Sequence, residues 1–158
     1  ISKGFGIETT GMRRNINQTD AIFDYSYPIE NKLDELSKAD IVVLCCPLTP
    51  ETKGLIDSKA LSAMKSSAYL INVARGGCVI EEDLVKALKN GDIAAAGIDV
   101  TDPEPLPSSS NLWGIENVIL TPHTGGETRL YEDNVLDILI ENIERLERGK
   151  VDLLNQII

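Results

Sequence analysis

Short apolar runs rich in β-branched residues alternate with segments of helical apolar spacing, and this alternation restricts the fold more than any other feature of the chain. Strands are expected at 7–12, 41–46, 68–73, 94–100 and 118–120. Helices are expected at 31–38, 58–65, 81–89 and 128–148. Strands joined by helical crossovers form a parallel sheet with helices on both faces, so we predict a doubly wound, Rossmann-like α/β fold.

The pattern also predicts burial and element ends. The run at 41–46 is nearly continuous, which is typical of a strand buried on both faces. Asp57 is placed to cap the helix that follows it, and Gly91 is placed to end the helix before it. The segment 102–110 holds three of the seven prolines and is expected to be a loop.

Composition and charge argue against several kinds of protein. The chain has 158 residues, which fits one domain, and its net charge of −10 without a Lys/Arg block argues against a nucleic-acid partner. No apolar run is long enough for a membrane span and no signal peptide is visible, so we expect a cytoplasmic protein. Cys45, Cys46 and Cys78 lack CxxC spacing, so we expect buried or half-buried thiols and no metal site.

Ionisable residues follow three of the expected strands, at the edge where an open α/β sheet binds its ligands. Arg75, Glu104 and His123 each lie in a setting rich in Gly or Pro. Arg75 is suited to hold a carboxylate through two parallel hydrogen bonds, and His123 to exchange a proton near neutral pH. Glu104 would orient His123 and favour its imidazolium form. This set suits a reaction on a small 2-hydroxy or 2-oxo acid.

Each of these residues also has a plainer interpretation. His123 is the only histidine, and a lone histidine is usually a surface or capping residue. Arg75 before two glycines can be a turn residue, and Glu104 in a Pro-rich loop can simply be solvated. Asp99 at a strand end can be a capping residue. The functional interpretation therefore depends on all four residues falling at equivalent strand ends.

Four segments together resemble the D-isomer-specific 2-hydroxyacid dehydrogenase family, in its nucleotide-binding domain. They are Pro-Leu-Thr-Pro-Glu-Thr-Lys-Gly-Leu-Ile at 47–56, Leu-Ile-Asn-Val-Ala-Arg-Gly-Gly at 70–77, Ala-Gly-Ile-Asp-Val-Thr-Asp-Pro-Glu-Pro at 96–105 and Thr-Pro-His-Thr-Gly-Gly at 121–126. The resemblance extends from about Gly4 to Ile158. It implies an enzyme that transfers a hydride between a nicotinamide cofactor and a small D-2-hydroxy acid or 2-oxo acid. A glyoxylate/hydroxypyruvate reductase or a phosphoglycerate dehydrogenase is the expected type.

The resemblance also implies roles for individual residues. Arg75 matches the family's substrate-binding arginine, Glu104 its catalytic glutamate and His123 its acid/base histidine. Glu rather than Gln at position 104 argues against the formate-oxidising branch. The implied cofactor contacts are Pro47 and Thr52 beside the nucleotide, Val73, Ala74, Arg75, His123, Gly125 and Gly126 around the nicotinamide, and Asp99 as acceptor for the carboxamide.

Two features depart from the family pattern. The dinucleotide fingerprint G-x-G-x-x-G is absent. We therefore interpret 1–158 as a partial NAD(P)-binding domain, truncated at its N-terminus, that lacks the first strand, the Gly-rich loop and the substrate domain, apart from a possible piece near 150–158. Second, Arg13 and Arg14 stand where the family often has an acid for the ribose hydroxyls. Two guanidinium groups attract a 2′-phosphate, which favours NADP slightly over NAD or tolerance of both, whereas the alternative is two exposed arginines at a strand end.

Three hypotheses follow. The chain is an oxidoreductase domain, or a non-catalytic remnant that binds a nucleotide or a protein partner, or a truncated chain that folds poorly because its sheet exposes unpaired edges. By analogy with the family, the helix at 128–148 is expected to form a homodimer contact.

Overall fold

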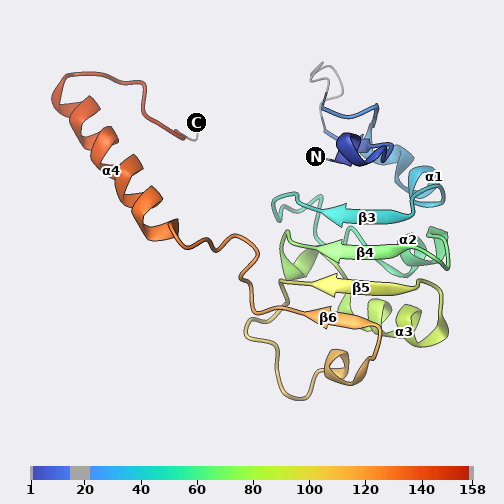
Figure 1. Ribbon diagram of the computed structural model, residues 1–158. Helices are drawn as coiled ribbons and strands as arrows, with labels where there is room; N and C mark the ends of the chain where they lie inside the picture. The colour runs from blue at the N-terminus through green and yellow to red at the C-terminus, as the bar shows by residue number, and fades with distance from the viewer. Residues whose placement is uncertain (1, 15–21, 157–158) are drawn as a thin grey trace. The chain divides into compact units, whose positions relative to one another are not determined.

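A computed structural model describes residues 2–14 and 22–156. The chain divides into two compact units, Ile1–His123 and Thr124–Ile158. The first unit contains strands β1 (Thr10–Met12), β2 (Tyr25–Tyr27), β3 (Ile41–Leu44), β4 (Tyr69–Asn72), β5 (Ala95–Ile98) and β6 (Val118–Leu120) (Figure 1). Its helices are η1 (Ser2–Phe5), η2 (Ile29–Asn31), α1 (Lys32–Leu36), α2 (Ser58–Ala63), η3 (Gly76–Cys78), α3 (Glu81–Asn90) and η4 (Asn111–Gly114).

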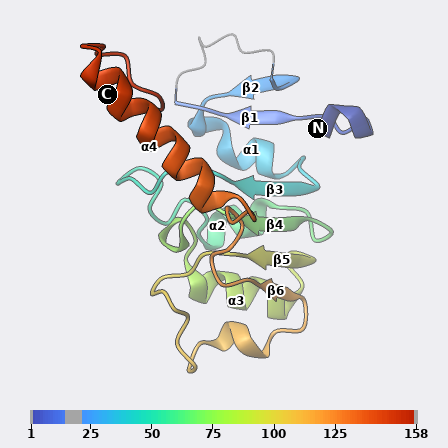
Figure 2. The ribbon, with the colours of Figure 1, turned by 60° about the vertical axis from the view of Figure 1, so that its left-hand side comes forward.

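The strands form two parallel sheets. One has the order β3-β4-β5-β6 and the other pairs β1 with β2. Within the described residues, no backbone ladder joins β1 to β3, and the small sheet lies beyond the β3 edge of the large one (Figure 2). The parallel strands and helical crossovers confirm the Rossmann-like α/β prediction. The structure adds that the sheet is interrupted between β1 and β3.

One face of the large sheet carries the core of the first unit. The register aligns Leu44 with Asn72 and Ile98, and Leu70 with Ala96, and all five side chains are buried. The helices join this core through side chains that belong to the same buried cluster. These are Leu36 of α1, Ala60 and Leu61 of α2, and Leu84, Val85, Ala87 and Leu88 of α3.

The opposite face of the large sheet is open within the first unit. Ile41, Val43 and Ile119 are 56%, 53% and 72% exposed. The prediction that the strand at 41–46 is buried on both faces was therefore wrong within this unit, whereas the prediction of helices on both faces, made for the whole chain, stays a prediction for the second face. The reason is that β-branched residues favour a strand on either face, whereas their pattern does not reveal what covers the second face.

Most elements are shorter than predicted. The strand expected at 7–12 forms only over Thr10–Met12, and β2 was not predicted. The strand at 118–120 and the loop at 102–110 are confirmed. The helix caps are confirmed as well: Asp57 Oδ1 accepts a hydrogen bond of 2.9 Å from Ala60 N, and Gly91 ends α3 in the left-handed region at φ 74°.

The second unit contains α4 (Tyr131–Glu147), the turns that precede it from Thr124, and the segment that follows it. Leu154 N donates to Asn142 Oδ1 at 2.7 Å and Arg145 Nη1 donates to Asp152 O at 3.1 Å, so the segment folds back along α4. The predicted apolar stripe is present and exposed in the described chain, at Val135, Leu136, Leu139, Ile143 and Leu146. No helix among the described residues is long and apolar enough to cross a membrane.

Candidate active site

The strands of the large sheet all run in the same direction, so their carboxyl ends meet at one edge. Arg75 follows β4, Asp99 follows β5, and His123 follows β6. Glu104 lies in the Pro-rich loop after β5. The topology therefore brings the ionisable residues predicted from the sequence to the same edge.

Glu104 and His123 form a hydrogen-bonded pair. Glu104 Oε2 lies 2.9 Å from His123 Nδ1, and Glu104 Oε1 accepts a 2.9 Å hydrogen bond from Thr101 N. The hydrogen bond with His123 and then the Thr101 N–H hold the pKa of the Glu104 carboxyl below its ordinary value, and the nearby charge of Arg75 contributes. The ionised Glu104 can only accept, so the proton between the two groups belongs to Nδ1, and Nε2 takes no part in this hydrogen bond.

The backbone of His123 adopts an uncommon conformation. Its φ is 58°, in the left-handed region that non-glycine residues rarely occupy. Such a backbone costs about 1 kcal/mol, which the fold must offset elsewhere. The turn directly follows Thr121 and Pro122 and carries the imidazole to Glu104.

The loop after β4 is shaped by Asn72, which was not among the site residues predicted from the sequence. Its buried amide accepts from Ala74 N at 3.0 Å and donates to Arg75 O at 3.2 Å. A buried amide inside the apolar run 70–74 is the signal that could have identified it. Arg75 Nη1 donates to Ala74 O at 2.6 Å, and the Arg75 side chain lies at the surface.

Gly76 sets the distance between this loop and the next one. A Cβ at Gly76 would lie 2.0 Å from the carbonyl carbon of Thr101, which is a backbone atom. Only glycine therefore permits the loop of Arg75 to touch the loop that holds Glu104.

Asp99 joins the ends of three strands. Its amide donates to Asn72 O at 3.0 Å, and its buried carboxylate accepts a short hydrogen bond from the Thr121 hydroxyl. Thr121 was also not selected from the sequence. The predicted contact of Asp99 with a carboxamide stays a prediction.

A cavity of about 450 Å³ opens beside Arg75. Three of the predicted cofactor residues line it with Arg75, namely Pro47, Val73 and Ala74. Thr52 does not line it but shapes its rim, because its hydroxyl donates to Pro47 O at 2.7 Å and accepts from Thr49 N at 2.7 Å.

The thiols differ in burial. Cys45 and Cys46 line the same cavity, and burial raises the pKa of the Cys46 thiol, to which the neighbouring Cys78 also contributes. Cys78 is buried and Cys46 half-buried, as predicted, whereas Cys45 is exposed. The prediction was wrong for Cys45 because its side chain follows Ile41 and Val43 on the face of the sheet that is open within the first unit.

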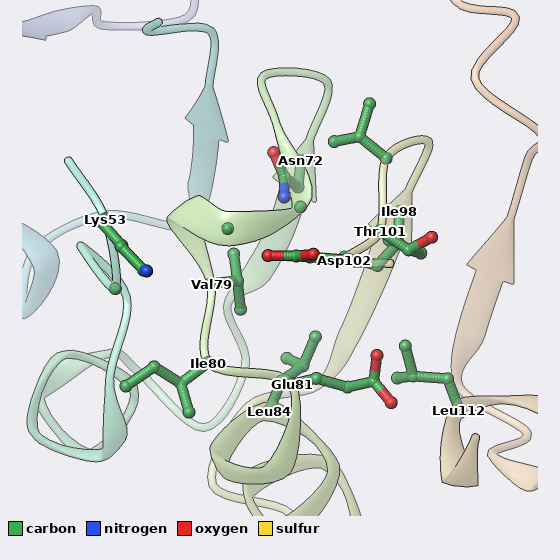
Figure 3. Close-up of a pocket in the computed structure, with 14 residues that line it drawn as sticks. Lys53, Asn72, Val79, Ile80, Glu81, Leu84, Ile98, Thr101, Asp102 and Leu112 are labelled. Atoms are coloured by element: carbon green, nitrogen blue, oxygen red, sulfur yellow. The ribbon is translucent and has the colours of Figure 1, made fainter. Parts of the chain in front are cut away.

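A second cavity of about 390 Å³ is lined in part by Gly76 and Gly77 (Figure 3). The side chain of Asp102 extends into it between Asn72 and Val79. None of the residues predicted for catalysis or cofactor binding lines this cavity.

Arg13 and Arg14 lie at the carboxyl end of β1 and behave differently. The guanidinium of Arg13 lies 5.0 Å from the centre of the Phe23 ring, whereas Arg14 Nη2 lies 3.5 Å from Glu51 Oε2. Gly125 and Gly126 belong to the second unit. Their predicted contact with the nicotinamide stays a prediction.

Comparisons with known proteins identify the family of this chain. Residues 1–125 match the family model of the D-isomer specific 2-hydroxyacid dehydrogenase, NAD binding domain. A glyoxylate reductase of Korarchaeum cryptofilum is 36% identical over 98% of this chain and 47% of its own length. A hydroxypyruvate reductase of Blautia hydrogenotrophica is 38% identical over 79% of this chain and 39% of its own length.

Solved structures show the same relationship. A D-isomer specific 2-hydroxyacid dehydrogenase from Xanthobacter autotrophicus, in complex with NADPH and MES, is 36% identical with a TM-score of 0.82, over 97% of this chain and 62% of that one. A family member from Aeromonas salmonicida is 35% identical with a TM-score of 0.88, over 99% of this chain and 49% of that one. The chain spans about half the length of the curated relatives, at 52%, 39% and 47% of three of them. On its sequence, its fold and its matched family model, the chain belongs to the D-isomer specific 2-hydroxyacid dehydrogenase family through its NAD binding domain.

Proposed function

We propose that this chain supplies the nucleotide-binding and acid/base part of an enzyme that interconverts a small D-2-hydroxy acid and its 2-oxo acid. The observation that carries the proposal is the hydrogen bond between Glu104 and His123, with the charge of Arg75 close by. Relatives named glyoxylate reductase and hydroxypyruvate reductase support a 2-oxo acid of that size as substrate. A phosphoglycerate dehydrogenase is the other type expected for this chain, and turnover of the two substrates against that of the 2-oxo form of phosphoglycerate distinguishes them.

The carboxyl edge of the sheets fits a dinucleotide. From β3 to β6 the edge spans three strand spacings, roughly 14 Å, and β1 with Arg13 and Arg14 lies beyond β3. The cavity at Pro47, Val73 and Ala74 lies along this edge. An elongated anionic ligand bound along this edge would meet Arg13 and Arg14 at one end, and Asp99 and His123 at the other. We assign the cofactor site to this edge, where a nicotinamide nucleotide would supply or accept the hydride.

The side chains of this chain would handle the substrate. Arg75 would hold the carboxylate, since one guanidinium N–H is engaged by Ala74 O and the group carries five donors. In the reductive direction, His123 would donate the Nε2 proton to the substrate oxygen as that oxygen gains charge. Glu104 would stabilise the imidazolium before the transfer and fix the ring orientation throughout.

The test is a titration with NADPH and NADH, followed by turnover with glyoxylate and hydroxypyruvate, both carried out on a protein in which this chain is joined to the first strand, the Gly-rich loop and the substrate domain that it is proposed to lack. We expect saturable binding of nucleotide, seen in nicotinamide fluorescence. His123→Asn should leave that binding within about twofold and lower turnover by about 10²-fold or more, because it removes only the proton transfer. Glu116→Gln removes a carboxylate just before β6, at the opposite edge of the sheet, and should change neither quantity. The proposal is contradicted if neither nucleotide binds, or if His123→Asn turns over at the original rate.

Several finer properties belong to the same proposal. Arg13 and Arg14 support a slight preference for NADP, the exposed stripe of α4 supports a homodimer, and the three free cysteines support the cytoplasm. The chain would be a partial NAD(P)-binding domain, completed by a substrate domain that is not formed by the described residues. Residues 150–156 bond to α4, so their assignment to that domain stays a prediction.

The second candidate is a non-catalytic module that binds a nucleotide or a protein partner. The exposed apolar face of the large sheet favours it, because extended apolar surfaces mark interaction sites. Nucleotide binding without turnover of glyoxylate or hydroxypyruvate, in the same protein with the substrate domain present, would support this candidate over the enzyme.

A further inference from the structure

An ion pair links the two sheets at the edge assigned to the cofactor. Arg14 follows β1, and Glu51 lies in the loop after β3. Arg14 Nη2 lies 3.5 Å from Glu51 Oε2, although no backbone ladder joins these two strands in the described part of the chain. A carboxylate therefore lies beside one of the arginines to which we assign the 2′-phosphate.

Glu51 is held in place by its own loop. Thr49 Oγ1 donates to Glu51 Oε2 at 2.6 Å, and this is the same oxygen that faces Arg14. Thr52 anchors the turn through Thr49 N and Pro47 O, both at 2.7 Å. The Thr49 hydroxyl is the main cause that lowers the pKa of the Glu51 carboxyl, with a smaller contribution from Arg14. The negative charge is thus fixed in position at neutral pH.

The two arginines are not equally available. Arg13 lies over the ring of Phe23, which supplies a cation–π contact on one side of its guanidinium. The side chain of Arg14 is 81% exposed and forms an ion pair with Glu51. A phosphate arriving from solvent would therefore meet Arg14 first, with Glu51 beside it.

We propose that Glu51 is a specificity-determining residue for the cofactor: it opposes a 2′-phosphate at Arg14 and accepts a hydrogen bond from a free ribose 2′-hydroxyl. This rests on the proposed function. The pair then serves both nucleotides, because Arg14 attracts the phosphate of NADPH and Glu51 binds the hydroxyl of NADH. The chain carries the acidic group for the ribose on the loop after β3, in addition to the arginines after β1.

The expected size of the effect follows from the charges. A carboxylate about 7 Å from a phosphate dianion in a solvent-exposed setting weakens its binding by about five- to tenfold. Because both groups are exposed, salt should screen much of this effect.

The experiment measures dissociation constants of NADPH and NADH for the full chain at low and high salt, by nicotinamide fluorescence. Glu51→Gln should tighten NADPH about five- to tenfold at low salt and weaken NADH about twofold. Arg14→Gln should weaken NADPH about tenfold and leave NADH nearly unchanged. Glu116→Gln, with the same loss of charge at the opposite edge, should shift neither constant. Competition by 2′,5′-ADP and 5′-AMP should show the same selectivity, which isolates the phosphate from the nicotinamide.

The outcomes separate this inference from the proposed function. If both nucleotides bind and Glu51→Gln leaves their affinity ratio within twofold of the unmodified chain, the role of Glu51 is overturned while the cofactor site stands. If Glu116→Gln changes the ratio as much as Glu51→Gln, the effect is one of net charge and the inference is again overturned. If neither nucleotide binds the unmodified chain, the proposed function fails and this inference fails with it.

Discussion

At the scale of single residues, Gly76 and Asn72 control the candidate site more than their chemistry suggests. Neither can exchange a proton near neutral pH, yet Asn72 fixes the path of the chain through Ala74 and Arg75. Gly76 lets that path touch the backbone of Thr101, whose amide holds Glu104. The position of the ionisable groups therefore depends on a buried amide and on a missing side chain.

Gly76→Ala should destabilise the fold by about 2 kcal/mol or more, because the added Cβ would overlap backbone atoms that a rotamer change cannot relieve. Gly114→Ala is the matched control, since nothing lies within 4 Å of a Cβ there. Urea denaturation of both variants measures the difference. Equal stability of the two variants would contradict the close approach of the two loops.

At the scale of elements, the sequence predicted which segments form strands and helices better than where they end. The runs at 68–73 and 94–100 became Tyr69–Asn72 and Ala95–Ile98, because apolar character continues beyond the last ladder hydrogen bond. The strand β2, Tyr25–Tyr27, alternates over only three residues, which is too short for a strand pattern, and it escaped prediction. It exists because it pairs with β1, and such a contact between distant segments leaves no local pattern.

The candidate site shows the same division. Arg75, Glu104 and His123 were predicted because they follow strands in sequence, and parallel topology then collects them at one edge. Asn72, Thr121 and Glu51 were not selected, because their importance depends on distances between loops. The resemblance to a family assigned roles, but it could not indicate that Glu51 faces Arg14.

Asp24 offers a test of how β1 and β2 are joined. Its carboxylate accepts from Thr9 N and from Thr9 Oγ1, both at 2.8 Å, and the Thr9 hydroxyl is the main cause that lowers the Asp24 pKa from 3.8 to about 2. A lowered pKa stabilises the fold above the unfolded value, and this contribution is lost as the pH falls from about 4 to about 2. NMR titration of the carboxyl carbon should give a midpoint of about 2.

Thr9→Val is the variant for that measurement. It removes the hydroxyl and retains the backbone amide, so the midpoint should move from about 2 toward 3.8. Ser37→Ala removes a hydroxyl that bonds to Asp34 O in another part of the unit, and it should leave the Asp24 titration unchanged. A midpoint that stays fixed in Thr9→Val would contradict the assigned cause.

At the scale of the whole molecule, the described residues form two sheets whose strands differ in the number of paired neighbours. Strands β4 and β5 have neighbours on both sides, whereas β1 and β2 pair only with each other in the described chain. The core cluster lies entirely under the large sheet. The hypothesis of a chain that folds poorly can therefore be replaced by a more specific expectation, in which the two sheets differ in stability.

Amide hydrogen exchange should reveal that difference. Protection at Leu70 and Ile71 of β4 should exceed protection at Met12 and Tyr27 by about 10²-fold or more, because central strands open only with the core. Repeating the exchange measurement with nucleotide present shows whether ligand binding changes the difference in protection between the two sheets. Uniform protection across both sheets would show that they open together.

The interruption between β1 and β3 has a mechanical consequence. In the described residues the two sheets share no ladder, and the ion pair of Arg14 and Glu51 spans the space between them, so a movement of one sheet past the other would break no backbone ladder there. A ligand that binds Arg14 beside one sheet and the loop of Glu51 beside the other would hold the two sheets together. Its binding free energy would then oppose movement of one sheet past the other, and this resistance would rise with the concentration of the ligand.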